Sequence, residues 1–141
     1  MLDRVEVLTK LSFGFSTLTV YPDADTETTS VDGYAQRAGD GTWASIRDGA
    51  GTTGNSTETT GEFIQISSSN TLDQWTRIRR SIFLFDTSAL TAAADISAGV
   101  MSLKGTAKAD TYDTPAAPDI DIYTSTPNEN TDVAASDYGQ I

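Results

Sequence analysis

The stretch Arg77-Ile78-Arg79-Arg80-Ser81-Ile82-Phe83-Leu84-Phe85-Asp86-Thr87-Ser88-Ala89-Leu90 decides the fold class of this chain. Three arginines fall within four residues, an apolar run of β-branched and aromatic residues follows, and Asp, Thr and Ser close the run. This pattern is typical of a strand that is buried on both faces and ends in a hydrogen-bonded turn. It predicts a long central strand over 75–87, with Asp86 as the side chain that forms the turn.

Shorter strand patterns lie on both sides of this central strand. We expect strands over 11–20 (with a bulge near 14–17), 31–37, 41–48, 63–66, 96–104 and 119–123. In the last of these, Ile120 and Ile122 should point into the core. The small polar residues of 49–61 predict an exposed loop, and 88–94 a turn or a single helical turn. About seven to nine strands joined by polar turns predict an all-β protein, an antiparallel β-sandwich.

The charge of the chain excludes two classes of partner. The 141 residues include 9 basic and 20 acidic side chains, so the formal net charge is −11. A nucleic-acid binder needs cations that displace counterions, so we expect no nucleic-acid partner. Negative charge repels anionic headgroups, and no window is long and apolar enough to span a bilayer, so we expect no membrane partner. The N-terminus lacks the apolar core of a signal peptide. We therefore expect no export signal in this chain, unless a leader was removed.

The absence of histidine and cysteine limits the available chemistry. It removes thiol chemistry, the usual zinc sites, the Ser-His-Asp and Cys-His arrangements and the most common general base. Catalysis would have to rest on carboxylates, Tyr or Lys. We therefore expect no enzymatic activity.

One motif resembles a known family. The segment 80–90, followed by Ile96-Ser97-Ala98-Gly99-Val100-Met101-Ser102-Leu103, is similar to the core signature of jelly-roll modules, typically R-S-F-L-x-F-D-x-S-x-L-P followed by I-S-S-A-x-L-S-L. The pattern is known from DNRLRE-type and related carbohydrate-binding-like modules of bacterial surface proteins, and similar stretches occur in uncharacterised structural proteins of tailed phages. The resemblance covers roughly 31–141, with Thr91 standing where a proline is common.

The resemblance implies a jelly-roll β-sandwich over 31–141. Residues 1–30 are then expected to form N-terminal strands and an acidic loop, an assembly arm outside that domain. Jelly-roll modules of this kind usually run several strands beyond this point, so the sandwich is expected to be incomplete at its C-terminus. Either the chain is a fragment, or a partner supplies the missing strands by strand addition.

Three aromatic residues are candidates for glycan binding. Tyr34, Trp43 and Trp75 carry rings that can stack on the apolar faces of a pyranose. The alternative, which we favour, is that both tryptophans are core or sheet-face residues of a small sandwich.

Four aspartates are candidates for a structural calcium site. Asp23 and Asp25 alternate in an acidic stretch, and Asp119 and Asp121 alternate in a second one. Calcium prefers such oxygen ligands, and the resemblance implies a structural calcium ion. Neither stretch has the spacing of an EF-hand, and the alternative that we favour is a set of solvated turn residues.

The arginines before the apolar run also allow two interpretations. Arg77 and Arg79 share one face of the predicted strand, and Arg80 lies on the other. Their planar guanidinium groups suit a carboxylate or an anionic glycan. We favour the alternative that they pair with acidic side chains on neighbouring strands.

Two functions fit these observations. The first is a non-enzymatic structural or interaction protein of a phage-like virus particle, such as a capsid decoration, tail or fibre component. It would contact other virion or surface proteins through sandwich surfaces and strand edges, and we expect a homo-oligomer or an assembly-dependent fold. The alternative is a carbohydrate-binding module of a secreted or cell-surface protein. Both interpretations predict a virion or extracellular location.

Overall fold

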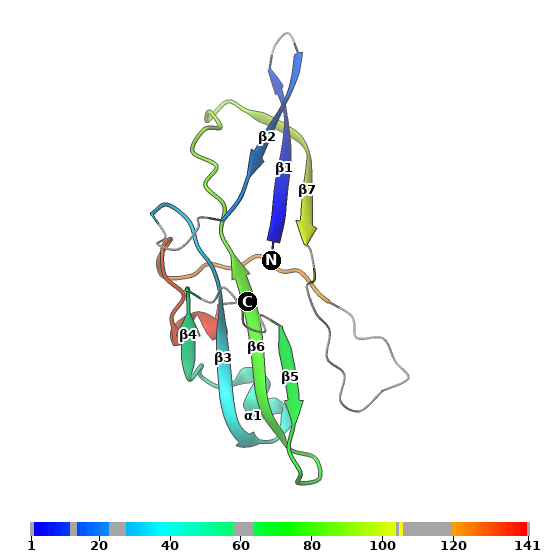
Figure 1. Ribbon diagram of the computed structural model, residues 1–141, viewed down its shortest axis with the longest axis vertical. Helices are drawn as coiled ribbons and strands as arrows, with labels where there is room; N and C mark the ends of the chain where they lie inside the picture. The colour runs from blue at the N-terminus through cyan, green and yellow to red at the C-terminus, as the bar shows by residue number, and fades with distance from the viewer. Residues whose placement is uncertain are drawn as a thin grey trace. The chain divides into compact units, whose positions relative to one another are not determined.

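The computed structural model describes residues 2–11, 14–22, 28–57, 64–103, 105 and 120–140. Its contacts divide the chain into two compact units, each built from segments that are distant in the sequence. The first unit comprises Met1–Tyr21 and Leu90–Thr124, and the second comprises Pro22–Ala89 and Ser125–Ile141. Each unit contains one antiparallel sheet and is described by itself (Figure 1).

The first unit contains a three-stranded sheet. Its strands are β1 (Leu2–Leu11), β2 (Gly14–Val20) and β7 (Asp95–Leu103), in the order β2-β1-β7. The strands β1 and β2 form a hairpin with continuous register, so the single strand predicted over 11–20 and its bulge are wrong. The irregular register lies instead between β1 and β7. The reason is that β1 ends at Leu11 and the antiparallel β2 begins at Gly14, so the two halves of the predicted strand belong to different strands.

The second unit contains a four-stranded sheet. Its strands are β3 (Asp32–Gly41), β4 (Thr53–Asn55), β5 (Gln65–Ser68) and β6 (Trp75–Phe83), in the order β4-β3-β6-β5. The prediction of a central strand is confirmed, because β6 pairs with β3 on one side and β5 on the other. The strand ends at Phe83, four residues before the predicted end. The strand β4 lies inside the stretch that was predicted to be a loop.

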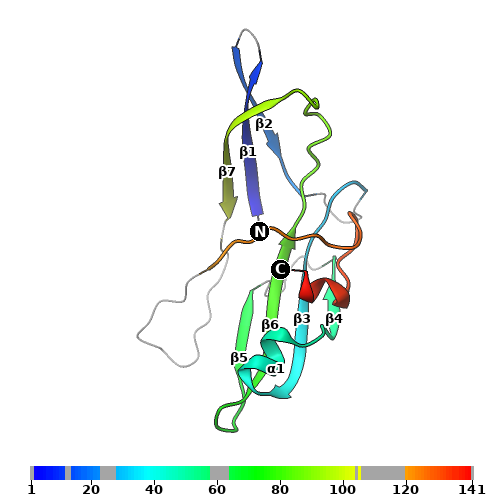
Figure 2. The ribbon, with the colours of Figure 1, turned by 180° about the vertical axis from the view of Figure 1, so that it is seen from behind.

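Helical turns and the C-terminal segment pack against this four-stranded sheet. The helix α1 (Trp43–Asp48) and the 3₁₀ helix η1 (Ala135–Gly139) contact β3, and Figure 2 shows both in front of the sheet. The buried apolar cluster combines residues of the sheet, α1 and the C-terminal segment: Val31, Ala35, Ile46, Ile78, Ile82, Val133 and Tyr138. Burial of apolar area of this kind is the main stabilising term of a small fold.

The strand predicted over 41–48 is wrong, because these residues form α1. Thr42 is the N-cap, and its side-chain oxygen accepts a hydrogen bond from the Ser45 backbone N–H. Such a cap satisfies a backbone donor that the first helical turn leaves free. The helical turn places Ile46 in the core with 1% of its surface exposed. The strand was predicted from Trp43 and Ile46, but their spacing of three residues and the capping Thr42 are typical of a helical turn.

The strand predicted over 119–123 is also wrong for the described residues 120–123, which have no regular secondary structure. Ile120 and Ile122 are 62% and 66% exposed, so they do not point into a core. Alternation favours a strand only where a neighbouring strand can take up its backbone hydrogen bonds. Among the described residues, 120–123 have no such neighbour.

The C-terminal segment is held together by a buried carboxylate. Asp137 is 1% exposed, and its two carboxylate oxygens accept hydrogen bonds from the Asn128 and Ala134 backbone N–H groups at 3.1 and 2.8 Å. These bonds offset the cost of burying the charge. They order a segment with little regular structure, which lies against the four-stranded sheet in place of a further strand.

The fold is therefore an antiparallel all-β arrangement with little helix. The jelly-roll sandwich stays a prediction, and so does the division into domains at 1–30 and 31–141. The units defined by contacts do cross that division, because β7 pairs with β1.

We predict that Gly54→Ala destabilises the second unit. A Cβ atom at Gly54 would lie 2.0 Å from the Val133 carbonyl oxygen, so the backbone of the C-terminal segment would have to move. Overpacking of this kind costs about 1–3 kcal/mol. Urea unfolding followed by circular dichroism measures the loss. The control is Gly139→Ala, because no atom lies within 4 Å of the added Cβ. Equal stability of the two variants would contradict this packing.

Candidate interaction surface

Among the elements whose side chains the structure describes, the edge strand β7 is the most exposed. Every residue from Asp95 to Val100 is exposed, on both faces of the strand. The exposed residues include large apolar side chains, with Ile96, Val100 and Leu103 at 53%, 49% and 44%. Among the described residues, β7 pairs only with β1, so its other side presents backbone N–H and C=O groups that have no partner strand.

The opposite edge of the same sheet is β2. Thr17 and Thr19 are exposed, while Leu18 and Val20 are half-buried. Val20 and Met101 both pair in register with Val5, so they lie on the same face of the sheet as Leu18. The side chains of Leu18, Val20 and Met101 on this face are half-buried, whereas Thr19 and Val100 on the other face are exposed to solvent.

Neither edge contains lysine or proline, although the register shift at Ser97 gives β7 a local irregularity. Natural edge strands tend to contain lysine, proline or inward-pointing charges that block the approach of another strand. The strand β2 has no charged residue and no proline, and β7 has only Asp95 at its first position. In a chain with net charge −11, β2 is uncharged and β7 is uncharged from Ile96 to Leu103, and these two long edges form the candidate interaction surface.

The four-stranded sheet has a shorter apolar edge. In β5, Ile66 is 63% exposed, and Ile64 just before the strand is 53% exposed. The strand has four residues, and the turn that follows it exposes Leu72 at 86%. This edge offers less than half the backbone length of β7, which has nine residues.

The structure brings together two of the three predicted aromatic residues. The rings of Trp43 and Trp75 meet edge to face, with centroids 5.5 Å apart and planes at 62°. Both are half-buried and pack against the core cluster. Tyr34 is 6% exposed, and the Arg79 guanidinium lies 4.4 Å from its ring centroid. Because its ring is covered, Tyr34 is not part of an open stacking platform.

Only one of the four predicted calcium ligands lies in the described part of the chain. Asp121 is exposed, and Asp23, Asp25 and Asp119 lie outside the described residues. Within the described ranges, no group of three acidic side chains is placed to hold a metal ion.

The three arginines of the central strand make separate contacts. Arg79 donates to the Gln36 side-chain oxygen at 2.9 Å, and Arg77 approaches the Gln65 side-chain oxygen at 3.4 Å. The register places these residues on the face of the sheet opposite to Ile78 and Ile82.

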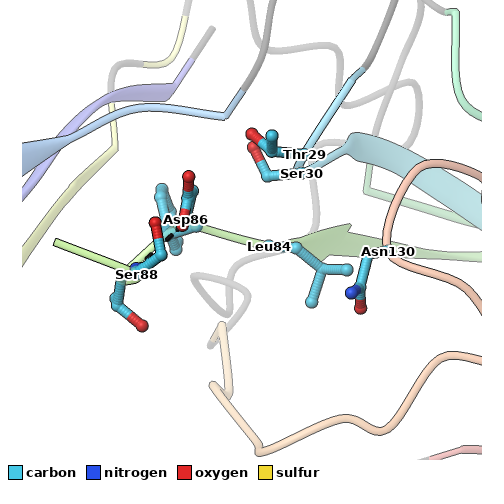
Figure 3. Close-up of a pocket in the computed structure, with 8 residues that line it drawn as sticks. Thr29, Ser30, Leu84, Asp86, Ser88 and Asn130 are labelled. Atoms are coloured by element: carbon cyan, nitrogen blue, oxygen red, sulfur yellow. Dashed lines mark hydrogen bonds between the residues drawn. The ribbon is translucent and has the colours of Figure 1, made fainter. Parts of the chain in front are cut away.

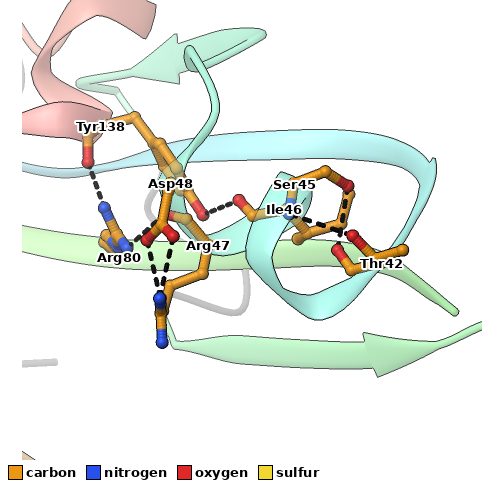
Figure 4. Close-up of polar contacts among 7 residues, drawn as sticks. All are labelled: Thr42, Ser45, Ile46, Arg47, Asp48, Arg80 and Tyr138. Atoms are coloured by element: carbon orange, nitrogen blue, oxygen red, sulfur yellow. Dashed lines mark hydrogen bonds and ion pairs between the residues drawn. The ribbon is translucent and has the colours of Figure 1, made fainter. Parts of the chain in front are cut away.

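Arg80 lies on the covered face and joins three elements (Figure 4). Its guanidinium donates to the backbone carbonyl oxygens of Tyr138 and of Arg47, the latter at 2.8 Å, and lies 4.1 Å from the Tyr138 ring centroid. The Tyr138 hydroxyl in turn donates to the Ile46 carbonyl oxygen at 2.7 Å. Arginine suits this position because its fixed fork supplies several donors and its plane stacks on an aromatic ring. Arg80 thus links β6 to α1 and η1, and these two hydrogen bonds go to carbonyl oxygens instead of the carboxylates that we expected.

Arg47 and Asp48 form an exposed ion pair next to this network. The Arg47 guanidinium donates to both carboxylate oxygens of Asp48, at 2.6 and 2.8 Å. These hydrogen bonds hold the pKa of Asp48 below its ordinary value, and the charges of Arg47 and Arg80 act in the same direction. Because both side chains are exposed, solvent screens the pair and it adds little to stability.

Asp86 has the structural role predicted for it. Its carboxylate accepts a hydrogen bond from the Ser88 backbone N–H at 2.8 Å, which closes a turn after β6. The turn borders a small polar hollow that is also lined by Thr29, Ser30, Leu84 and Asn130 (Figure 3). Among the described residues that line the hollow, Asp86 supplies the carboxylate, and it is engaged in the turn.

Comparisons of the chain with protein-family models, curated proteins and solved structures find no match. None of the helices among the described residues has the length and hydropathy that a membrane-spanning helix needs.

We predict that the Tyr138 hydroxyl makes stability fall in alkaline solution. Burial raises the pKa of Tyr138 above its ordinary value of 10.0, and the nearby Arg80 only partly opposes this. The folded state therefore favours the neutral phenol. The contribution of this hydroxyl to the free energy of unfolding is fully present below about pH 10, and it is lost as pH rises through the raised pKa. Thermal unfolding of wild type from pH 8 to 11 should show this loss.

The matched variant is Tyr138→Phe, which keeps the ring over Arg80 and removes the hydrogen bond to Ile46. We expect it to cost about 1 kcal/mol at pH 8, the usual value of one hydrogen bond. The difference from wild type should shrink above pH 10. A constant difference across this range would show that the hydroxyl has the same pKa in the folded and unfolded states, which would contradict the prediction.

Proposed function

We propose that this chain is a non-enzymatic structural or interaction protein of a phage-like virus particle, a capsid decoration, tail or fibre component. The observation that carries the proposal is the pair of long edges, β2 and β7, which carry no charge apart from Asp95 and of which β7 also exposes Ile96 and Val100. Assembly proteins use such edges because a strand from a partner satisfies the free backbone groups along its whole length.

The rest of the chain supports a binding role over a catalytic one. The sequence has no histidine or cysteine, so the common nucleophile and base pairs are absent from it. The arginine and tyrosine that meet on the covered face, Arg80 and Tyr138, are engaged in holding α1 and η1. The high acidic charge keeps the protein soluble at a particle surface and disfavours contact with nucleic acid.

The jelly-roll sandwich is part of this proposal. A sandwich needs a second sheet over the apolar face of the first, and strands from a virion or surface partner would complete it by strand addition. The protein would then act at a virion or extracellular surface, and its fold would become complete on assembly.

We predict that the chain is a stable component of virus particles of its source. Particles purified by density gradient and washed in high salt should contain it at a fixed ratio to the major capsid protein. A gold-labelled antibody should mark a defined part of the particle in electron micrographs. Its absence from intact particles, or its removal by the salt wash, would overturn the proposal.

A carbohydrate-binding module is the second candidate. The observation in its favour is that the fold brings Trp43 and Trp75, 32 residues apart in the sequence, to a ring distance of 5.5 Å. Aromatic rings at this spacing contact sugar rings by stacking. A structural calcium ion belongs to this candidate, held either by the stretch with Asp23 and Asp25 or by the stretch with Asp119 and Asp121.

The second candidate predicts that a glycan array detects binding by wild type and that Trp43→Ala abolishes it. Removing a half-buried tryptophan also costs stability, about 2 kcal/mol, so folding must be checked by circular dichroism. Trp43→Phe is the matched control, because it keeps an aromatic face and most of the packing. If wild type binds no glycan, with or without added calcium, this candidate is excluded.

A further inference from the structure

The strand β7 is long, apolar and open, and the sheet to which it belongs is small. Eight of the nine residues of β7 pair on one side with β1, Ser97 being left out at a register shift, and the six consecutive residues from Asp95 to Val100 are exposed. A sheet of three strands is near the lower limit of independent stability in water. A further strand against β7 would satisfy its free backbone groups and cover part of its exposed apolar surface.

The direction of the strands indicates what kind of strand fits there. Both β2 and β7 run antiparallel to β1, so β2 and β7 are parallel to each other. If β7 met β2 of a translated copy, the new pair would be parallel. If β7 met β7 of a copy related by a twofold axis, the new pair would be antiparallel. Antiparallel pairs are slightly more stable, and twofold dimers are the commonest assemblies.

Charge also favours contact between copies at this strand. The three strands of the sheet contain two cations and three anions, which gives −1 of the net charge of −11. Most other surfaces of two copies therefore repel each other. The eight residues from Ile96 to Leu103 are uncharged, so two β7 strands can approach without placing like charges together.

We propose that two copies of this chain pair through β7, edge to edge and antiparallel, into a six-stranded sheet with the order β2-β1-β7-β7-β1-β2. This inference deepens the proposed function, on which it rests, by naming a second copy as the partner of this edge. The twofold pairing leaves β2 at both outer edges, where virion partners can add strands.

Site-directed cross-linking tests the pairing, because the chain has no cysteine and one introduced cysteine is unique. Cysteine is placed singly at exposed β7 positions by Ser97→Cys, Ala98→Cys, Gly99→Cys and Val100→Cys. The control variants are Thr19→Cys on β2 and Ser68→Cys on β5, which are exposed edge positions elsewhere. A short bismaleimide reagent is added to each variant and to mixtures of two variants.

We expect a covalent dimer from one or more β7 variants alone and little from either control variant. Pairing of β7 with β2 would give a different result, in which only the mixture of Thr19→Cys and Val100→Cys is linked. That result would overturn the twofold arrangement. Equal linking of Ser68→Cys would show that the reagent reports random collisions, which would also overturn the proposal.

A charge variant supplies an independent measurement on the uncross-linked protein. Val100→Lys places a cation on each β7 strand near the twofold axis, and it should raise the dissociation constant of the dimer about tenfold or more. Val100→Thr is the control, because threonine is β-branched and uncharged and should leave dimerisation close to wild type. Light scattering measures the dimer, and circular dichroism shows that both variants are folded.

The failures of the two proposals are distinguishable. A chain that stays monomeric at its highest soluble concentration but is found in virus particles overturns the β7 pairing alone. A chain that dimerises through β7 but is absent from particles overturns the virion function alone.

Discussion

The second unit depends on the contact between Arg80 and Tyr138. Strand β6 supplies the arginine, and one guanidinium bonds the carbonyl oxygens of Arg47 in α1 and Tyr138 in η1 while it stacks on the tyrosine ring. Tyr138 is fully buried, and its hydroxyl bonds Ile46 of the same helix. Because these groups share partners, α1, η1 and the sheet are held as one body. A short segment with little regular structure can thereby cover an apolar sheet face.

Among its described residues, the first unit has no side chain that holds another segment against the sheet as Arg80 does in the second unit. Its strand β7 is therefore exposed on both faces. The side chains of Ile96, Val100 and Leu103 remain partly in water, although their burial would be favourable. A free edge without lysine or proline is an aggregation hazard for a monomer, whereas in an assembly protein it is the natural contact surface. The second unit covers the apolar face of its sheet, whereas the first unit leaves β7 exposed. This contrast is the main physical argument for a role in assembly.

Several elements could be predicted from the sequence for clear reasons. The apolar run before Asp86 predicted the central strand, and the Asp-Thr-Ser sequence predicted the turn that Asp86 and Ser88 form. The segments that were wrong are short or lack a partner. Trp43 and Ile46 are three residues apart, a spacing that fits a helical turn better than a strand. Alternation over 119–123 carries no information on whether a neighbouring strand exists. The tryptophan pair was named as a candidate, but its packing on the core depends on contacts between distant residues.

The sequence by itself determined that the chain is rich in antiparallel strands, acidic, and without histidine or cysteine, because these properties follow from residue identity and local periodicity. Only the tertiary structure decided which strands lie at an edge, that Tyr34 is covered by Arg79, and that Arg80 bonds carbonyl oxygens on two other elements. The physical reason is that strand order and side-chain partners arise from pairings between distant segments. A local sequence pattern predicts that a segment can form a strand, but it does not predict which other segment that strand pairs with.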